Sequence, residues 1–308
     1  MSYYHLTITS NSIKIKLANA IKIHIRGEDF VSDCNTCPSN GGCEKDKEQC
    51  MIENNPMNKI KNVIGVMSGK GGVGKSTISV MIAKQLNQLG FKVGILDADI
   101  TGPSIPRLIG LKNKKAQGTE EYIYPVETED GIKVMSLNFL IEDENQPVIW
   151  RGPAIAGTVK QFWTDVLWED LDYLLIDMPP GTGDVPLTVM QSIPINGLVM
   201  VSVPQDLVSM IVSKAVNMAK KMDINILGII ENMSYIECPD CNKKIKLFDG
   251  KNTDEFIKEN DLFLLGELPM INAISNLSSN DYKSTTLDLW NIFNPTVMNI
   301  IKRLEEVK

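Results

Sequence analysis

Residues 68–77 have the sequence SGKGGVGKST, which follows the apolar run NVIGVM and precedes the amphipathic stretch ISVMIAKQLNQLG. The order of glycine, four residues, glycine, lysine and serine, placed between a strand and a helix, is the pattern of a phosphate-binding loop. Glycines let the backbone amides turn toward phosphate oxygens, and the dipole of the following helix adds a favourable field. The stretch predicts a nucleotide site, but kinases, motors, switches and carriers all use such loops.

Around this loop, short apolar runs alternate with helical patterns. The runs NVIGVMS, KVGILDAD, IKVMSLNFL, DYLLIDMPP, NGLVMVSVP, NILGIIENMS and FLLGELP have the near-continuous apolar character of strands buried on both faces. Helical patterns cover residues 76–89, 154–168 and 206–222, which favours right-handed crossovers between parallel strands. We predict one α/β domain over residues 61–308, with a mostly parallel sheet and helices on both faces.

Composition restricts the partners and the compartment. The chain has 308 residues, 43% of them hydrophobic, and a formal net charge of -7. This charge argues against a broad nucleic-acid-binding face, which needs clustered Lys and Arg. No apolar run reaches the roughly 20 residues that span a bilayer, and residues 1–30 lack the pattern of a signal peptide. We therefore expect a cytoplasmic protein that binds neither nucleic acid nor membrane.

The first 60 residues differ from the rest. Residues 1–30 show a weak alternating pattern and no site chemistry, and we expect an overextended gene start with Val31 as a GTG-encoded initiator. Residues 31–60 are polar and contain Gly, Pro and Asn, which predicts a flexible arm. The arm holds four of the six cysteines, Cys34, Cys37, Cys43 and Cys50. In a reducing compartment such a group binds metal or does redox chemistry more often than it forms disulfides.

The two lysines of the loop have different expected roles. Lys75 would contact the β and γ phosphates, and Ser76 would ligate Mg²⁺. Lys70 is not required by the minimal pattern. It is either a solvated loop lysine or a second cation for the transferred phosphate, which would have the logic of an arginine finger. The predicted nucleotide-binding residues of this stretch are Gly69, Lys70, Gly71, Gly72, Val73, Gly74, Lys75, Ser76 and Thr77.

Aspartates end two of the predicted strands. ILDADITGP places Asp97 and Asp99 at one strand end, and LLIDMPPGTGD places Asp177 at another. Carboxylates at the carboxyl edge of a parallel sheet face the crevice where ligands bind. We predict Asp177, rather than Asp97, on the magnesium side, and Asp99 as the residue that positions the attacking water. The guanine-specific Asn-Lys-x-Asp pattern is absent, since Met233 follows Asn232, so ATP is the expected nucleotide.

The other two cysteines, Cys238 and Cys241, form a C-x-x-C pair in ECPDCNKK. Two thiolates are fewer than the four that a tetrahedral zinc ion or an iron–sulfur cluster generally takes. A twofold symmetric dimer would double the pair, so that two copies hold one bridging cluster. A dithiol redox pair, a zinc site and cysteines without a function are the alternatives.

Together these motifs resemble the Mrp/ApbC/Nbp family of iron–sulfur cluster carrier ATPases, which have the MinD/ParA type of P-loop fold, over roughly residues 60–280. The resemblance rests on GVMSGKGGVGKST, LDADITGPSIPRLIG, VIWRGP, DYLLIDMPPGTGD, VSVPQDL and GIIENMSYIECPDC. It implies a homodimer in which Lys70 reaches the partner's ATP and Asn232 lines the adenine pocket. It also implies that Cys238 and Cys241 bind a bridging 4Fe-4S cluster that is transferred to apoproteins.

The arm resembles that of the cytosolic Nbp-type scaffold members in its C-x2-C-x5-C spacing, which implies a second cluster there. Those members have another cysteine upstream, whereas this chain has Cys50 seven positions after Cys43 and none upstream, so zinc binding or a redox-labile arm is the alternative. Two other functions compete with the carrier. One is a ParA/MinD-like positioning ATPase that binds DNA or membrane, and the other is an electron-transfer iron protein resembling nitrogenase reductase.

Overall fold

The structure is a computed structural model that describes strands at residues 7–9, 12–16 and 22–26, and then residues 51–141, 150, 152–205, 210–238, 240–241, 243–246, 251–270 and 282–307. The three N-terminal strands, β1 (Thr7–Thr9), β2 (Ser12–Lys16) and β3 (Lys22–Arg26), pair in an antiparallel sheet. The arm cysteines Cys34, Cys37, Cys43 and Cys50 lie outside the described residues.

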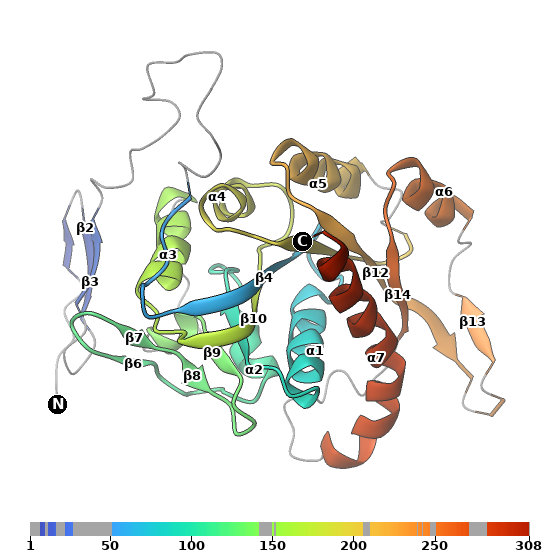
Figure 1. Cartoon of the computed structure of the whole chain (residues 1–308), viewed down its shortest axis with the longest axis horizontal. Coiled ribbons are helices and arrows are strands. Elements are labelled where there is room, and N and C mark those ends of the chain that lie inside the picture. Colours follow the sequence, from blue (N-terminus) through green and yellow to red (C-terminus); the bar gives the residue numbers. More distant parts are fainter. Residues whose placement is uncertain are drawn as a thin grey trace.

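A nine-stranded sheet forms the centre of the domain (Figure 1). Its strands are β4 (Lys59–Ser68), β5 (Val93–Asp97), β8 (Val126–Glu127), β9 (Lys133–Met135), β10 (Asp170–Asp177), β11 (Gly197–Ser202), β12 (Ile226–Glu237), β13 (Lys244–Lys246) and β14 (Leu264–Pro269). The order is β13-β12-β11-β4-β10-β5-β9-β8, and β14 pairs with β12. Only the pairs β12–β13 and β8–β9 are antiparallel within this sheet of described strands. The prediction of a mostly parallel sheet is confirmed.

Helices cover both faces of this sheet. They are α1 (Lys75–Gln88), α2 (Ile105–Leu108), α3 (Gly152–Thr164), α4 (Asp184–Ser192), α5 (Met210–Lys221), α6 (Lys251–Glu259) and α7 (Tyr282–Glu306). In Figure 1, α3, α4 and α5 lie on one side of the strands, and α1 and α7 lie on the other. Two short strands, β6 (Gln117–Gly118) and β7 (Ile123–Tyr124), form a separate antiparallel pair.

The core follows from this double coverage. β5 and β11 are buried at every residue, and β4 is buried from Asn62 to Ser68. Aromatic side chains fill the space between sheet and helices, and Trp168 and Phe293 are fully buried. Full burial of one such large apolar side chain contributes about 1.5–3 kcal/mol. Strands buried on both faces read as continuous apolar runs, which is why the sequence located them.

The last part of the segment that the sequence assigns to the arm packs on the domain. The Ile52 backbone N–H donates to the Ser192 carbonyl at 2.9 Å, and the indole N–H of Trp163 donates to the Ile52 carbonyl at 3.1 Å. Ser192 ends α4 and Trp163 belongs to α3. Because both backbone groups of Ile52 have partners on these helices, the packed domain begins about nine residues before residue 61.

The C-terminal helix α7 uses its apolar face in the core. Phe293, Val297, Ile300 and Leu304 are buried at the three- and four-residue spacing of one helical face. Beside this face, the Arg303 guanidinium lies 5.5 Å from the centre of the Phe263 ring. In the described part of the chain, no helix has the length and apolar character needed to cross a membrane.

Gly228 in β12 is a position where the sheet leaves no room for a side chain. Its φ is 153°, and a Cβ there would lie 2.3 Å from the carbonyl oxygen of Phe263. That carbonyl accepts a hydrogen bond from the Ile229 N–H at 2.8 Å, so it cannot move away without breaking the pairing. We predict that Gly228→Ala lowers the free energy of unfolding by about 2–4 kcal/mol, seen as a lower Tm in thermal unfolding followed by circular dichroism.

The matched control is Gly183→Ala, because a Cβ at Gly183 meets nothing within 4 Å and the φ of Gly183 is -78°. Gly183 is the N-cap of α4, where alanine costs about 1 kcal/mol or less relative to glycine, so the Tm of this variant should fall much less than that of Gly228→Ala. Equal Tm values for Gly228→Ala and the parent would show that β12 and the strand after Phe263 can separate at this point without loss of stability.

Candidate functional site

The phosphate loop, residues 69–74, joins the end of β4 to the start of α1. The Ser68 hydroxyl donates to the Lys70 carbonyl at 3.0 Å and so fixes the first turn of the loop. At Gly74 the φ is 85°, and a Cβ would lie 2.4 Å from Nδ2 of Asn232, so glycine is required there. The first turn of α1 has no acidic side chain, and no side chain caps it. Its N–H groups therefore remain available to phosphate oxygens.

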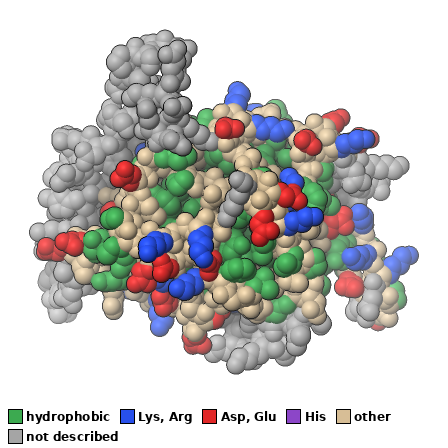
Figure 2. Space-filling model, viewed as in Figure 1, with side chains coloured by type: hydrophobic (Ala, Val, Ile, Leu, Met, Phe, Trp, Pro, Cys, Tyr) green, Lys and Arg blue, Asp and Glu red, His purple; other side chains and the backbone are tan. Residues whose placement is uncertain are grey.

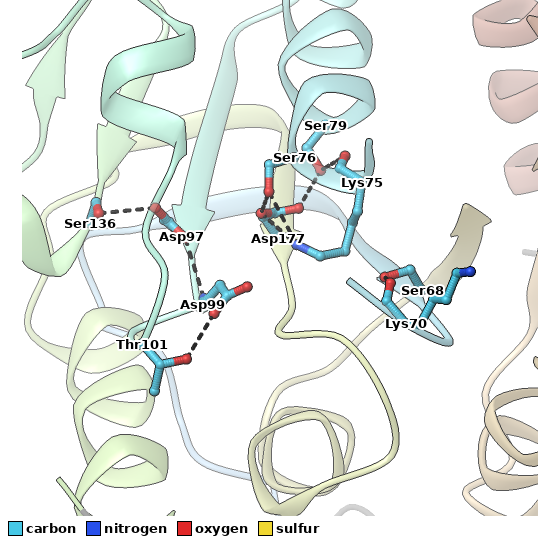
Figure 3. Close-up of polar contacts among 10 residues, drawn as sticks. All are labelled: Ser68, Lys70, Lys75, Ser76, Ser79, Asp97, Asp99, Thr101, Ser136 and Asp177. Atoms are coloured by element: carbon cyan, nitrogen blue, oxygen red, sulfur yellow. Dashed lines mark hydrogen bonds and ion pairs between the residues drawn. The ribbon is translucent and has the colours of Figure 1, made fainter. Parts of the chain in front are cut away.

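Asp177, the last residue of β10, accepts three donors from the first two turns of α1 (Figure 3). Its Oδ2 accepts a hydrogen bond from the Ser76 hydroxyl at 2.6 Å and pairs with the Lys75 ammonium at 2.7 Å. Its Oδ1 accepts from the Ser79 hydroxyl at 2.7 Å. The side chain of Lys75 is 6% exposed and that of Asp177 is 0% exposed. The structure thus brings together Lys75, Ser76 and Asp177, and their interaction is shielded from water.

Asp97 and Asp99 lie at the neighbouring strand end. Asp97 is the register partner of Asp177 across β5 and β10 and is fully buried. The Ser136 hydroxyl donates to Oδ2 of Asp97 at 3.0 Å, and the Asp99 N–H donates to its Oδ1 at 3.3 Å. Burial raises the pKa of Asp97 well above its usual range, and the neighbouring carboxylate of Asp177 raises this pKa further. Burial also raises the pKa of Asp99. Carboxyl groups with shifted pKa values in one crevice are typical of functional sites.

The oxygens at this edge of the sheet fit a divalent cation. Mg²⁺ prefers oxygen ligands and is commonly held by one or two carboxylate or hydroxyl groups together with substrate phosphates. The Ser76 hydroxyl and the Asp177 carboxylate, 2.6 Å apart at the start of α1, supply such a set. These two residues would hold the ion, which would neutralise charge on the bound phosphates.

Lys70 and Asn232 project from the loop region in different ways. In Figure 3 the Lys70 ammonium points away from Lys75 and Asp177, and Lys70 is exposed. Asn232, from β12, is buried, and its Nδ2 donates to the Val73 carbonyl at 2.9 Å. Its Oδ1 is buried and has no hydrogen-bond partner among the described residues. A buried acceptor without a hydrogen-bond donor lowers the free energy of unfolding by about 1–3 kcal/mol, and a donor on a bound ligand would remove this penalty.

Beyond Asn232, β12 continues into a hairpin with β13 that carries the two downstream cysteines. The Cys238 N–H donates to the Lys243 carbonyl at 3.0 Å, which closes the turn. Cys238 and Cys241 are free thiols, and Cys241 is exposed. The backbone N–H groups of Asp240 and Cys241 lower the pKa of the Cys238 thiol. Over the described ranges, no group of three or more His, Cys, Asp or Glu is placed to hold a metal ion, so this hairpin offers two thiolates per copy.

Sequence reasoning missed the two buried serines, Ser79 and Ser136, that hold the site's carboxylates. Ser79 lies one helical turn after Lys75, and Ser136 directly follows β9. Neither belongs to the loop pattern or to the strand-end aspartates. The signal was a single polar residue in an apolar stretch, ISVMIA and KVMSL, because a buried hydroxyl needs a polar partner.

A parallel sheet with this loop, a buried strand-end aspartate and an uncapped helix start defines the class of P-loop NTPases. Residues 59–304 match the family model described as ParA, NUBPL iron-transfer P-loop NTPase. An iron–sulfur cluster carrier protein of Clostridium perfringens is 50% identical over 260 residues, which cover 81% of this chain and 90% of that protein. The chain belongs to the NUBPL iron-transfer family of ParA-type P-loop NTPases, and the predicted family is confirmed.

Solved structures agree with this assignment. The nucleotide-binding protein of Archaeoglobus fulgidus, in complex with ADP, is 44% identical with a TM-score of 0.66, over 76% of this chain and 92% of that one. The cell division ATPase MinD of Pyrococcus furiosus is 18% identical with a TM-score of 0.53, over 78% of this chain and 98% of that one. The second likeness concerns the fold alone, and it confirms the predicted MinD/ParA type.

The buried pair of Lys75 and Asp177 has a consequence for the nucleotide-free protein. Lys75→Ala leaves the carboxylate of Asp177 in the core without its cation, and removing one partner of a buried pair costs about 3–5 kcal/mol. We predict a lower Tm for Lys75→Ala without nucleotide, and recovery of most of the loss in Lys75→Ala/Asp177→Asn. Differential scanning calorimetry measures both.

The matched control is Lys61→Ala, because Lys61 pairs with Asp172 at the same 2.7 Å distance but its side chain is 72% exposed. An exposed pair contributes about 1 kcal/mol or less. Equal destabilisation by Lys61→Ala and Lys75→Ala would contradict the importance given to burial.

Proposed function

We propose that the protein is an ATP-dependent carrier that accepts a 4Fe-4S cluster as cargo between two copies of the chain and passes it to apoproteins. The observation that carries this proposal is the position of Cys238 and Cys241. They are free thiols at the end of β12, the strand whose Asn232 contacts the phosphate loop. One strand therefore joins the expected nucleotide site to the expected cargo site. We place this activity in the cytoplasm, where thiols stay reduced.

Two copies are needed because of thiolate number. A four-iron cluster generally takes four cysteine ligands, and the hairpin offers two. Ile236 and Ile245 are cross-strand partners on this hairpin, and they are 38% and 50% exposed. A second copy related by twofold symmetry would cover this apolar pair and bring the two cysteine pairs together.

Charge near the hairpin suits an anionic cargo. Lys243, Lys244 and Lys246 are exposed on or beside β13, and Figure 2 shows basic side chains at this end of the molecule. Lys244 lies 4.4 Å from the ring centre of Tyr235, which holds it over β12. A cluster ligated by four thiolates carries net negative charge, and nearby cations favour the thiolate form of cysteine. Lys246 is paired with Glu267, and Glu237 and Asp240 are exposed beside the cysteines, so Lys243 and Lys244 are the cations that would favour retention of the cluster.

The proposed choice of ATP rests on Asn232. One N–H of its Nδ2 donates to the Val73 carbonyl, and its Oδ1 is a buried acceptor without a partner among the described residues, so Oδ1 is the group that needs a donor from a ligand. The exocyclic amino group of adenine is a donor, whereas guanine has a carbonyl oxygen at the same ring position. A buried acceptor facing a second acceptor is disfavoured, so the orientation of this amide favours ATP over GTP.

The proposed hydrolysis uses Lys75 and residues of the loop on the bound phosphates, Asp99 to position water, and Lys70 from the partner. Lys70 points away from its own site in Figure 3. Beside the loop, Met210 and Ile211 of α5 are 70% and 42% exposed, and Ile211 lies next to Gly69. Covering these apolar residues favours a second copy on this face, which would place its Lys70 near the phosphates. ATP binding and release would then change how closely the two copies approach.

Cysteine replacement tests the cargo site. Cys238→Ala/Cys241→Ala should abolish anaerobic transfer of a cluster to an apoprotein such as apo-aconitase, with ATP binding unchanged, because the phosphate loop is untouched. Reconstituted parent protein should hold about four irons per two chains. Iron and sulfide assays and visible absorption give the loading, and the activity of the recipient gives the transfer.

The control for this test replaces the arm cysteines Cys34, Cys37, Cys43 and Cys50 by Ala. A polar arm can fold around metal yet add little to the domain core, so this variant should retain transfer with weaker loading. If the arm variant is inactive and the Cys238/Cys241 variant transfers normally, the cargo site is not on the β12–β13 hairpin.

Mixing variants tests whether Lys70 acts across the dimer. Lys70→Ala should bind a fluorescent ATP analogue but lose most of its ATPase activity, by roughly tenfold or more, and Lys75→Ala should bind no nucleotide. In a mixed dimer, the site of the Lys70→Ala copy holds ATP and receives an intact Lys70 from the other copy. ATPase activity that appears on mixing the two inactive variants supports the proposal. Full activity of Lys70→Ala alone, or no recovery on mixing, contradicts it.

A further inference from the structure

Ser79 occupies a different place around Asp177 from the other two donors. Lys75 and Ser76 share Oδ2 of the carboxylate, at 2.7 and 2.6 Å, whereas Ser79 alone bonds Oδ1 among the described donors. Ser79 is 0% exposed and lies one helical turn deeper in α1 than the loop. Its hydroxyl is therefore directed at the strand end, and it lies away from the surface that phosphates would contact (Figure 3).

The Ser79 hydroxyl donates its hydrogen bond to Asp177. Oγ of Ser79 lies 3.1 Å from the Lys75 carbonyl and 2.7 Å from Oδ1 of Asp177. A serine hydroxyl has one proton, and a bond to a carboxylate is shorter and stronger than one to a neutral carbonyl. Within α1 the Lys75 carbonyl is the normal acceptor for the N–H four residues later, so the helix does not need the hydroxyl. The function of the hydroxyl is to hold the carboxylate.

Nucleotide binding would change the other two contacts. In the proposed function, Lys75 turns to the phosphates and Ser76 binds Mg²⁺, so both leave Oδ2. Asp177 is fully buried, and a buried carboxylate without a fixed donor is costly and free to rotate. We infer that Ser79 is the positioning residue of the magnesium site: it keeps Asp177 oriented toward the ion after Lys75 and Ser76 have been drawn to the nucleotide. This inference rests on the proposed nucleotide function.

The matched comparison is Ser136. It is also a fully buried serine, and its hydroxyl donates at 3.0 Å to the carboxylate of Asp97, which is next to Asp177 in the sheet. Replacing either serine by alanine removes one buried hydroxyl from the same crevice. Of these two serines, Ser79 is the one that contacts Asp177, the carboxylate that we assign to Mg²⁺. The loss of Ser79 should therefore lower the gain in nucleotide affinity that Mg²⁺ supplies more than the loss of Ser136 does.

The test measures binding of a fluorescent ADP analogue in EDTA and in excess Mg²⁺. The ratio of the two Kd values gives the gain in affinity that Mg²⁺ supplies. For Ser79→Ala this gain should fall about 10- to 100-fold, the value of a hydrogen bond to a charged group, while the Kd in EDTA stays within about threefold of the parent. Ser79→Thr, which keeps the hydroxyl, should restore the gain, and Ser136→Ala, whose hydroxyl bonds Asp97 and not Asp177, should reduce it much less than Ser79→Ala does.

The inference is overturned if Mg²⁺ raises the nucleotide affinity of Ser79→Ala as much as it raises that of the parent. It is also overturned if Ser136→Ala loses as much of this gain as Ser79→Ala does, because any cavity in the crevice would then have the same effect. If Ser79→Ala does not fold, Ser79→Cys keeps the size, weakens the donor and decides by the same ratio. Parent protein that binds no nucleotide in either buffer would instead refute the proposed function. The experiment therefore distinguishes failure of the inference about Ser79 from failure of the proposed function.

Discussion

The carboxylate of Asp177 is the buried charge around which the nucleotide end of the domain is arranged. It ends β10 in the middle of the sheet, is fully buried, and draws donors from Lys75, Ser76 and Ser79. Leaving such a charge unpaired would cost several kcal/mol, so α1 is held with its first two turns against the end of β10. That constraint fixes the direction in which the loop leaves β4. The start of α1 and the carboxylate then face the same crevice.

β12 gives the domain a physical path between its two ends. Asn232 contacts the loop, and six residues later the same strand reaches Cys238. Between them the chain is irregular: Met233 has a φ of 55°, and the pairing with β14 shifts register between Glu231 and Tyr235. The residue that contacts the loop, Asn232, and the hairpin that carries Cys238 belong to one stretch of backbone, so β12 is the direct structural link between the loop and the cysteines.

The parts of this structure that could be predicted from the sequence depend on local patterns. The loop, the strands buried on both faces and the strand-end Asp177 each have a signature within a few residues, and their mutual position follows from parallel pairing. The contact of Ser79 with Asp177 joins residues 98 positions apart and depends on the depth at which α1 packs on β10. The docking of Ile52 on α3 and α4 likewise requires the assembled surface, so a polar segment without periodicity gave no sign of it.

The polar groups of the site satisfy one another. The ammonium of Lys75 neutralises Asp177, and the Ser76 hydroxyl fills the remaining position on the same oxygen. In the proposed function, a nucleotide with Mg²⁺ would compete with this internal ion pair, and either part alone would compete poorly. Phosphate without metal would draw the ammonium of Lys75 away and leave the buried carboxylate of Asp177 facing the negative charge of the phosphate. Metal without phosphate meets a site still neutralised by Lys75. Under the proposed function, the ion pair of Lys75 and Asp177 would therefore make the binding of phosphate and the binding of metal depend on each other.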